Sequence, residues 1–319
     1  MKKTLGALLV AAAAAFSLPA AAQSPGTITF VVPAAPGGAF DIVARMFTDK
    51  LKDILGKPVV IDNRPGGNGV IGMRQVAQGK PDGTIFGIVS STFVSNQFIT
   101  KGYDFDQIKD MTPIINLVEA ASFLTVPGNS PFKSFNDMVL WAKANPGKLN
   151  VGTSFVTNIM DCAVIFDEVG ISVTYINYNG SGPLTKAILS EEINVGTPSF
   201  TAIKPHLATN GMRALAIVAK KRTNVAPEIP AIVEFVPNTM ASGGGIGVSG
   251  PKGMPREAVM AVNAAFNAAF AQDPTIMERL YAALGADQRG GTPEEWVKAQ
   301  ENDEAKYRAA AKIANIQPQ

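Results

Sequence analysis

The chain has 319 residues, 46% of them hydrophobic, with 28 Lys and Arg side chains against 26 Asp and Glu. Without Lys2 and Lys3, which lie in an expected leader, the basic residues also number 26, so the chain lacks the basic excess of a nucleic-acid-binding protein. A single cysteine and a single histidine exclude an internal disulfide and Cys/His zinc sites, so stability must come from one or two hydrophobic cores.

The first 22 residues have the three parts of a secretory signal peptide. Two lysines precede an apolar run from Leu5 to Phe16, and Pro19 and three alanines follow it. The apolar run is shorter than the roughly 20 residues that span a bilayer. We expect residues 1–22 to be removed rather than to form a helix of the mature protein. Because no cysteine follows the cleavage site, we expect release outside the cytoplasm without a lipid anchor.

Strand-like and helix-like runs alternate in the first part of the chain. The pattern predicts strands and helices in turn at 28–32, 41–55, 59–61, 70–78 and 85–89. The first helix has one apolar stripe and should end at Gly56, because a glycine is a common helix end and Pro58 forbids continuation.

The pattern restarts after a Pro/Gly break at 127–131. Ser134 and Asp137 form a variant capping box at the start of a helix predicted over 134–144. Four strands are predicted next, at 149–152, 173–176, 193–195 and 214–218, with helices that begin near Thr157, Gly182 and Thr201.

The last part of the chain is predominantly helical. A glycine-rich stretch at 242–245 is expected to open a return, followed by helices at 256–272 and 274–284. A final helix should begin at Thr292, because Thr292 can cap it, Pro293 fits the first helical position and acids follow.

Repeated strand and helix units favour an α/β fold in which mixed, mostly parallel sheets are covered by helices. We predict two lobes, 23–126 together with 246–319, and 127–245. The chain would cross between them near Val126 and near Ile246, which makes a hinge of two crossovers. The C-terminal helices are expected to return to the first lobe.

The loop after the first predicted strand reads PAAPGGAFD. A helix start leaves about four backbone amides without partners and carries roughly half a positive charge, so it attracts a carboxylate. Gly37 and Gly38 leave the approach open, and ligands bind at this edge of an open α/β sheet. The alternative is a tight turn with Asp41 as a helix-start acid. The GxGxxG and GxxxxGK[ST] patterns of nucleotide sites are absent.

An ordered set of motifs, VVPAAPGGAFDIVAR, IDNRPGGNGVIG, PDGT, AKANPGKLNVGTS, YNGSGP and TPEEW, resembles the solute receptors of tripartite tricarboxylate transporters, also called the Bug family. The resemblance covers essentially the whole mature chain. It implies a type II periplasmic binding fold whose two lobes close on a small carboxylate and deliver it to integral membrane permease subunits. We expect a periplasmic monomer with no cofactor, no metal and no nucleic-acid partner.

In the family, the loop matching Pro36, Gly37, Gly38 and Asp41 supplies backbone contacts to a ligand carboxylate, partly through water. Neutral amides can hold an anion without a cationic side chain. Asp41 either orients these amides or accepts a hydrogen bond from the ligand. We favour the orienting role, because a carboxylate that points inward would repel an anion.

The second lobe departs from the family pattern. Relatives carry roughly GSSGxGTSxH where this chain reads GTSFVTNIMD at 152–161, so a glycine and the histidine are missing. Thr153, Ser154, Thr157 and Asn158 still offer polar groups. Bulky side chains replace small ones, which disfavours a small, highly polar ligand such as citrate.

Phenylalanines adjoin the expected cleft at Phe40, Phe93, Phe155 and Phe200. We hypothesise apolar, partly aromatic walls that favour an aromatic or otherwise hydrophobic carboxylate over a di- or tricarboxylate. The alternative for each phenylalanine is the hydrophobic core. The predicted ligand-binding residues are Pro36, Gly37, Gly38, Phe40, Asp41, Ser91, Phe93, Thr153, Ser154, Phe155, Thr157, Thr197 and Ser199.

Other classes of protein fit less well. An enzyme could use Cys162 and His206 as nucleophile and base, but Cys162 lies in an apolar helical run and no GxSxG elbow occurs at a strand-to-helix junction. A transcription regulator would need a basic helix-turn-helix where the signal peptide stands. We therefore expect a receptor and no enzyme, and whether it serves a permease or a membrane sensor stays open.

Overall fold

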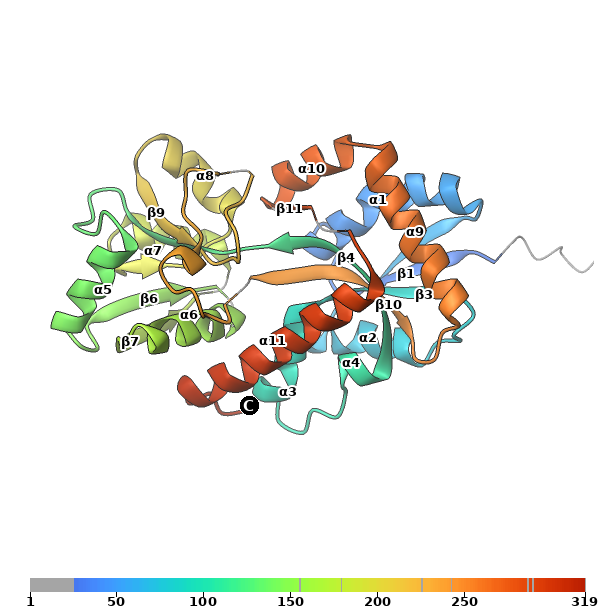
Figure 1. Ribbon diagram of the computed structural model, residues 1–319, viewed down its shortest axis with the longest axis horizontal. Helices are drawn as coiled ribbons and strands as arrows, with labels where there is room; N and C mark the ends of the chain where they lie inside the picture. The colour runs from blue at the N-terminus through green and yellow to red at the C-terminus, as the bar shows by residue number, and fades with distance from the viewer. Residues whose placement is uncertain are drawn as a thin grey trace, which may run out of the picture.

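The structure is a computed structural model that describes residues 26–154, 156–178, 180–224, 226–241, 243–285, 287–288 and 290–318. The expected signal peptide and Phe155 lie outside these residues. The chain forms two lobes, each a sheet flanked by helices, with long strands running between them (Figure 1). Within the described part, no helix is long and apolar enough to cross a membrane.

The first lobe is built on a sheet with the strand order β11-β4-β10-β3-β1-β2. Its strands are β1 (Ile28–Val32), β2 (Val59–Asn63), β3 (Ile85–Ser90), β4 (Met111–Ala120), β10 (Gly244–Pro251) and β11 (Asp287–Gln288). Its helical segments are α1 (Ala39–Leu55), η1 (Gly67–Gly69), α2 (Val70–Ala77), η2 (Ser91–Ser95), α3 (Asn96–Ile99), α4 (Gln107–Asp110), α9 (Arg256–Gln272) and α10 (Thr275–Leu284).

The second lobe is built on a sheet with the order β7-β6-β8-β5-β9. Its strands are β5 (Phe123–Pro127), β6 (Leu149–Thr153), β7 (Val173–Asn177), β8 (Val195–Gly196) and β9 (Met212–Ile217). Its helical segments are α5 (Phe135–Ala144), α6 (Val156–Glu168), α7 (Ser181–Leu189), α8 (Phe200–Ala208) and η3 (Ile232–Glu234). The last helix, α11 (Pro293–Ile313), follows β11.

Both sheets are mixed, as predicted. In the first sheet, β1, β2, β3 and β4 run in one direction, while β10 and β11 run in the other. In the second sheet, only β5 of the described strands opposes the rest. The strands β5 and β10 are those that enter a lobe from the other one, so the antiparallel pairing at these positions follows from the two crossings. The remaining parallel pairs need helical crossovers, which α1, α2, α6 and α7 supply.

The first crossing differs from the predicted position. β4 ends at Ala120 and β5, which pairs with β8 and β9, begins at Phe123, so residues 123–126 belong to the second sheet and not to the first lobe. The sequence from 113 to 126 has no glycine or proline after Pro113, so the first visible break marks the end of β5 and not the crossover. The second crossing leads into β10, which begins at Gly244.

Local signals set most of the helix ends. The Gly56 backbone takes a left-handed conformation with φ of 61° and ends α1, as predicted. The capping box of α5 is confirmed, because the Asp137 amide donates to Ser134 Oγ at 3.1 Å and the Ser134 amide donates to Asp137 Oδ2 at 2.9 Å. Thr292 caps α11 in the same way. These local contacts made the starts of both helices predictable.

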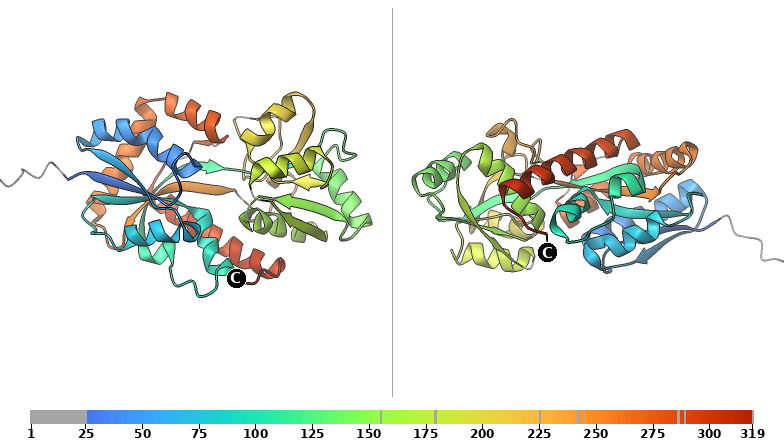
Figure 2. Two further views of the ribbon diagram at one scale, coloured as in Figure 1. Left: turned by 180° about the vertical axis from the view of Figure 1, so that it is seen from behind. Right: turned by 90° about the horizontal axis from the view of Figure 1, so that it is seen from below.

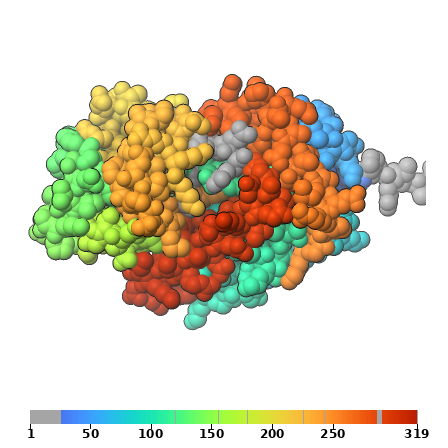
Figure 3. Space-filling model, in the orientation of Figure 1, coloured from blue at the N-terminus to red at the C-terminus, as the bar shows by residue number. Residues whose placement is uncertain are grey.

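The C-terminal helices do not all return to the first lobe. α9 and α10 pack against α1 in that lobe, as predicted. α11 lies across both lobes on one face of the molecule (Figures 2 and 3). Its Trp296 is buried with Val31 and Met73 of the first lobe, while its Tyr307 is buried with Met160 of the second. α11 therefore connects the lobes as a third element beside the two crossing strands.

Candidate functional site

A cleft of about 870 Å³ lies between the two lobes. Its first-lobe wall comes from the loops after β1, β2 and β3, and its second-lobe wall from the loops after β6, β7 and β8. β1 lies between β2 and β3, and β6 between β7 and β8, so the chain connections diverge to either side of each central strand. Such switch points at the carboxyl ends of strands are where open α/β sheets bind ligands.

Asp41 organises the loop that precedes α1. Its buried carboxylate accepts hydrogen bonds from the Gly37 amide at 2.8 Å, from Arg45 Nε at 2.9 Å and from Asn63 Nδ2 at 3.0 Å. The Arg45 hydrogen bond is the largest cause that lowers the pKa of Asp41, to about 2. Asn63 also donates to the carbonyl of Ala34 at 3.1 Å. This geometry supports the loop-orienting role favoured for Asp41.

The free amides at the start of α1 lie slightly later than predicted. The Gly37 amide is taken by Asp41, and the Gly38 amide donates to the Ala35 carbonyl at 3.3 Å. Among the described residues, the structure shows no acceptor for the amides of Ala39 and Phe40, and both residues line the cleft. Gly37, with φ of 82°, therefore forms the turn, and the unpartnered donors follow it at the helix start.

Two of the predicted aromatic residues line the cleft. The rings of Phe40 and Phe93 lie 5.1 Å apart between centroids and are half-buried on the first-lobe wall. Phe200, by contrast, is only 6% exposed and packs on Phe123 in the second-lobe core, so the core interpretation holds for it. The aromatic character of the cleft among described residues therefore comes from the first lobe.

Ser91 is not at the cleft. It is 1% exposed, and its Oγ accepts a hydrogen bond from the Gly245 amide at 2.9 Å, on the side of β10. Its neighbours Ser90 and Thr92 line the cleft instead, and the Ser90 hydroxyl donates to the Gly245 carbonyl at 3.0 Å. Ser90 is the last residue of β3 and Ser91 the first of η2, and both contact Gly245, so what distinguishes them is that only Ser90 also lines the cleft.

The second-lobe wall is polar. Ser154, Thr157, Thr197 and Ser199, all predicted, line the cleft, while Thr153 is fully buried beneath it. Several of these groups hold the loops: the Thr197 hydroxyl donates to the Gly152 carbonyl at 3.4 Å, and the Ser199 amide donates to Ser181 Oγ at 3.2 Å.

Asp161 is a cleft residue that sequence reasoning missed. It lies on α6, lines the cleft and is 4% exposed. Its Oδ1 lies 2.9 Å from Nζ of Lys306 on α11. An acid in the otherwise apolar run from Ile159 to Phe166 was the available signal, because a carboxylate inside such a helix face needs a partner or a role.

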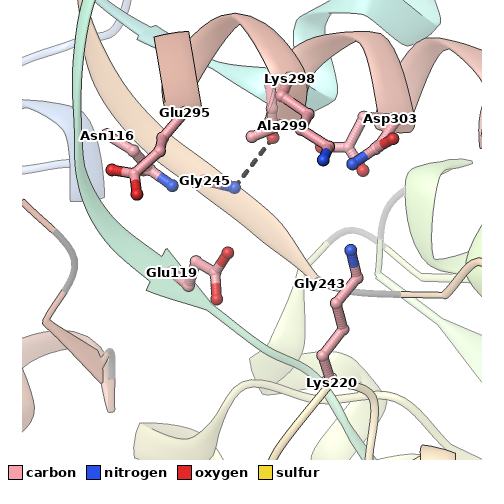
Figure 4. A pocket seen from close by; sticks show the side chains of 11 residues that line it. Asn116, Glu119, Lys220, Gly243, Gly245, Glu295, Lys298, Ala299 and Asp303 are labelled. Carbon is pink, nitrogen blue, oxygen red and sulfur yellow. Dashed lines mark hydrogen bonds between the residues drawn. The ribbon is translucent and has the colours of Figure 1, made fainter. Parts of the chain in front are cut away.

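A smaller cavity of about 190 Å³ lies on the α11 side of the waist (Figure 4). Its lining comes from both lobes: Glu119 of β4, Lys220 after β9, and Glu295 and Asp303 of α11. The hydrogen bond from Gly245 to Ser91 lies beside it. Because both lobes contribute, its shape depends on the angle between them.

The residues considered for catalysis lie apart from the cleft. Cys162 is fully buried in the second-lobe core, where burial raises the pKa of its thiol, so the reactive thiolate is disfavoured. His206 lies on a different helix, α8. Among the described residues, no group of three or more His, Cys, Asp or Glu side chains could hold a metal ion.

The chain is similar to known receptors over most of its length. The family model described as tripartite tricarboxylate transporter family receptor matches residues 43–309. A protein of Pseudomonas sp. (strain P51), the UPF0065 protein in the tcbD-tcbE intergenic region, is 32% identical over 275 residues, which are 84% of this chain and 80% of the relative.

Solved structures of similar fold agree with this family match. A TctC solute-binding protein from Polaromonas has a TM-score of 0.81 at 22% identity, over 90% of this chain and 98% of that one. The structure of R. palustris Rpa4515 with adipate has a TM-score of 0.73 at 28% identity, over 92% and 99%. The family and the fold are those of periplasmic solute-binding receptors and not of enzymes. This chain belongs to the tripartite tricarboxylate transporter receptor family.

Proposed function

We propose that this protein captures a small carboxylate with an aromatic or otherwise hydrophobic body in the cleft and delivers it to membrane subunits of a tripartite tricarboxylate-type transporter. The observation that carries the proposal is the start of α1, where Ala39 and Phe40 line the cleft and their amides show no acceptor among the described residues. Such amides, with the positive end of the helix dipole, bind anions.

The negative charge of Asp41 does not prevent the start of α1 from binding a carboxylate. Its negative charge is held by Arg45 and by the Gly37 amide, and its side chain is buried outside the cleft lining. It therefore fixes the loop so that the next amides point to the ligand, and the carboxylate gains preorganised donors. The adipate in the 28% identical Rpa4515 supports a carboxylate as the ligand class here.

The preference for an apolar body rests on Phe40 and Phe93. Phe40 belongs to the start of α1, and its ring lies 5.1 Å from that of Phe93 on the same cleft wall, so a ligand anchored there has an aromatic surface to pack against. Aromatic pairs in offset or edge-to-face arrangements contribute about 0.5–1.5 kcal/mol beyond the burial of area. A flat hydrophobic acid uses both features, whereas citrate uses only the first.

Release of the solute would follow from hinge motion. Two strands and α11 connect the lobes, and a ligand that contacts both walls favours the closed arrangement. A cleavable leader on residues 1–22 would place the protein in the periplasm, where a membrane transporter is within reach.

The proposal is tested by calorimetric titration of the purified protein, without residues 1–22, against benzoate, phenylpropionate, adipate and citrate. We expect at least one aromatic acid to bind about tenfold or more tightly than citrate, which corresponds to about 1.4 kcal/mol. Phe93→Ala should weaken binding of the aromatic acid more than binding of adipate.

Leu140→Ala is the matched control, because Leu140 is an apolar side chain on α5 that is 67% exposed and does not line the cleft. It should leave every affinity unchanged. Tight binding of citrate or adipate without measurable binding of either aromatic acid would contradict the aromatic preference. The absence of binding for all four acids would contradict the carboxylate class.

A further inference from the structure

A buried ion cluster of Asp161, Asp303 and Lys306 adjoins the second-lobe wall of the cleft through Asp161. Nζ of Lys306 lies 2.9 Å from Oδ1 of Asp161 and 2.8 Å from Oδ1 of Asp303, and it donates to the Gly243 carbonyl at 3.3 Å. The Lys306 side chain is fully buried, and both carboxylates are 6% exposed. The cluster therefore joins α6 of the second lobe to α11 and to the chain that leads into β10.

The charges of this cluster do not cancel. Burial favours the neutral amine, but the charge of Asp161 and further groups keep the pKa of Lys306 well above its ordinary value, so the ammonium form persists. One ammonium between two carboxylates leaves the three groups with a net charge of −1 when both acids are ionised. Inside a protein such a charge is weakly screened.

Only one of the three groups faces the ligand space. Asp161 lines the cleft, while Asp303 lines the smaller cavity on the α11 side. Among the described residues that line the cleft, Asp161 is the one titratable side chain, since the others are apolar or neutral polar residues. The ionisable group that a bound solute meets on the second-lobe wall is therefore a carboxylate, which carries a negative charge when Asp161 is ionised.

The two walls thus select for opposite groups. The start of α1 offers amide donors for a carboxylate, and Asp161 offers a carboxylate that repels a second anion and accepts a hydrogen bond. We infer that the solute carries one carboxylate and, at its far end, a hydroxyl or amino donor for Asp161, and that dicarboxylates long enough to reach Asp161 are rejected. This inference rests on the proposed function, in which α1 holds the solute carboxylate.

Matched ligands separate the inference from the proposed function. Calorimetry would compare benzoate and 3-phenylpropionate, each with a para hydroxyl, amino, methyl or carboxyl group. For at least one of the two lengths, we expect the hydroxyl or amino compound to bind about tenfold more tightly than the methyl compound, with the dicarboxylate weakest.

Two variants test the role of Asp161 itself. Asp161→Asn removes the charge on the cleft wall, so we expect the affinity for the dicarboxylate to rise about tenfold and the advantage of the hydroxyl over the methyl compound to shrink. Asp303→Asn is the control, because it removes the same charge and the other partner of Lys306 but does not line the cleft. It should keep the preference for the hydroxyl over the methyl compound.

Each outcome decides a separate point. If the dicarboxylate binds the unsubstituted protein as tightly as the hydroxyl compound, the inference is overturned while the proposed function stands. If Asp161→Asn and Asp303→Asn change the hydroxyl-to-methyl ratio equally, direct acceptance by Asp161 is overturned. If no acid in the series binds, both fail. Should Asp161→Asn not fold, the ligand series on the unsubstituted protein still decides.

Discussion

Asp41 and Asp161 are both buried aspartates near the cleft, and their surroundings give them different roles. Asp41 is bonded to the Gly37 amide, to Asn63 and to the half-exposed Arg45, which hold its pKa far below the ordinary value. Asp161 has a fully buried lysine as its partner, and burial raises its pKa. The first aspartate shapes the wall that donates hydrogen bonds, whereas the second forms part of the other wall. Residue type alone therefore does not determine the role.

The largest expected effect on stability comes from removing Lys306, the buried partner of Asp161. Lys306→Met would leave Asp161 and Asp303 buried without their ammonium partner, and such uncompensated charges typically cost about 3–5 kcal/mol. Urea denaturation should show this loss of unfolding free energy at neutral pH. Lys312→Met, at an exposed position on the same helix, should change it by less than about 0.5 kcal/mol. Similar losses of unfolding free energy for both variants would show that the buried ion cluster does not stabilise the protein more than an exposed lysine does.

A substitution at Asp41 should give a smaller loss of stability and a clear loss of ligand binding. Asp41→Asn keeps the shape of the side chain but weakens charge-assisted hydrogen bonds from Gly37 and Arg45, which are worth about 1.5–3 kcal/mol to buried partners. Because Arg45 is half exposed, we expect the lower end of this range. Chemical denaturation and titration with the best acid would measure both effects. Unchanged affinity of Asp41→Asn for the acid would show that the loop held by Asp41 does not position the ligand.

The two aspartates also differ in how pH acts on them. The folded-state pKa of Asp41 is about 2, below its ordinary value of 3.8, so its contribution to stability is present above pH 3.8 and is lost as the pH falls towards 2. Denaturation curves between pH 5 and pH 2 should therefore show a smaller fall in stability for Asp41→Asn than for the unsubstituted protein. Parallel falls would contradict the role of its ionised form.

The sequence predicted local features better than contacts between distant parts of the chain. The bounds of β1 and α9 agreed to the residue, and the capping box of α5 and the Thr292 cap of α11 were predicted, because these features depend on residues close together in sequence. The loop at Pro36–Asp41 was singled out as a helix start on similarly local grounds, and its ligand contacts stay a prediction. The contact of Asp161 with Lys306 joins distant parts of the chain. An acid in an apolar run indicates that a partner is needed, but one sequence does not identify that partner. The crossover between β4 and β5 was misplaced because no turn residue marks it.

A glycine on the first-lobe wall tests whether the position of the aromatic pair matters. In Gly69→Ala, the new methyl carbon would lie 3.0 Å from the ring of Phe93, at a backbone φ of 89° that disfavours side chains. We expect a loss of about 1–2 kcal/mol and weaker binding of aromatic acids. Gly102→Ala is the matched control, with φ of 68° and open space around the new carbon. Equal losses of aromatic-acid affinity in both variants would mean that the Phe93 ring does not form the ligand wall.

The last comparison distinguishes the hinge from the cleft at two serines, Ser91 and Ser154. Ser91→Ala removes the acceptor of the buried Gly245 amide, so the unfolding free energy should fall by about 1–3 kcal/mol, at the lower end if water reaches the amide from the adjoining cavity. Ser154→Ala, on the cleft wall, should leave stability within about 0.5 kcal/mol and act on ligand affinity instead. Urea denaturation and calorimetry on both variants give the comparison. If Ser91→Ala weakened binding with no change in stability, the hydroxyl of Ser91 would belong to the ligand site, as the sequence first suggested, and the strand end would have to turn by one residue on closure.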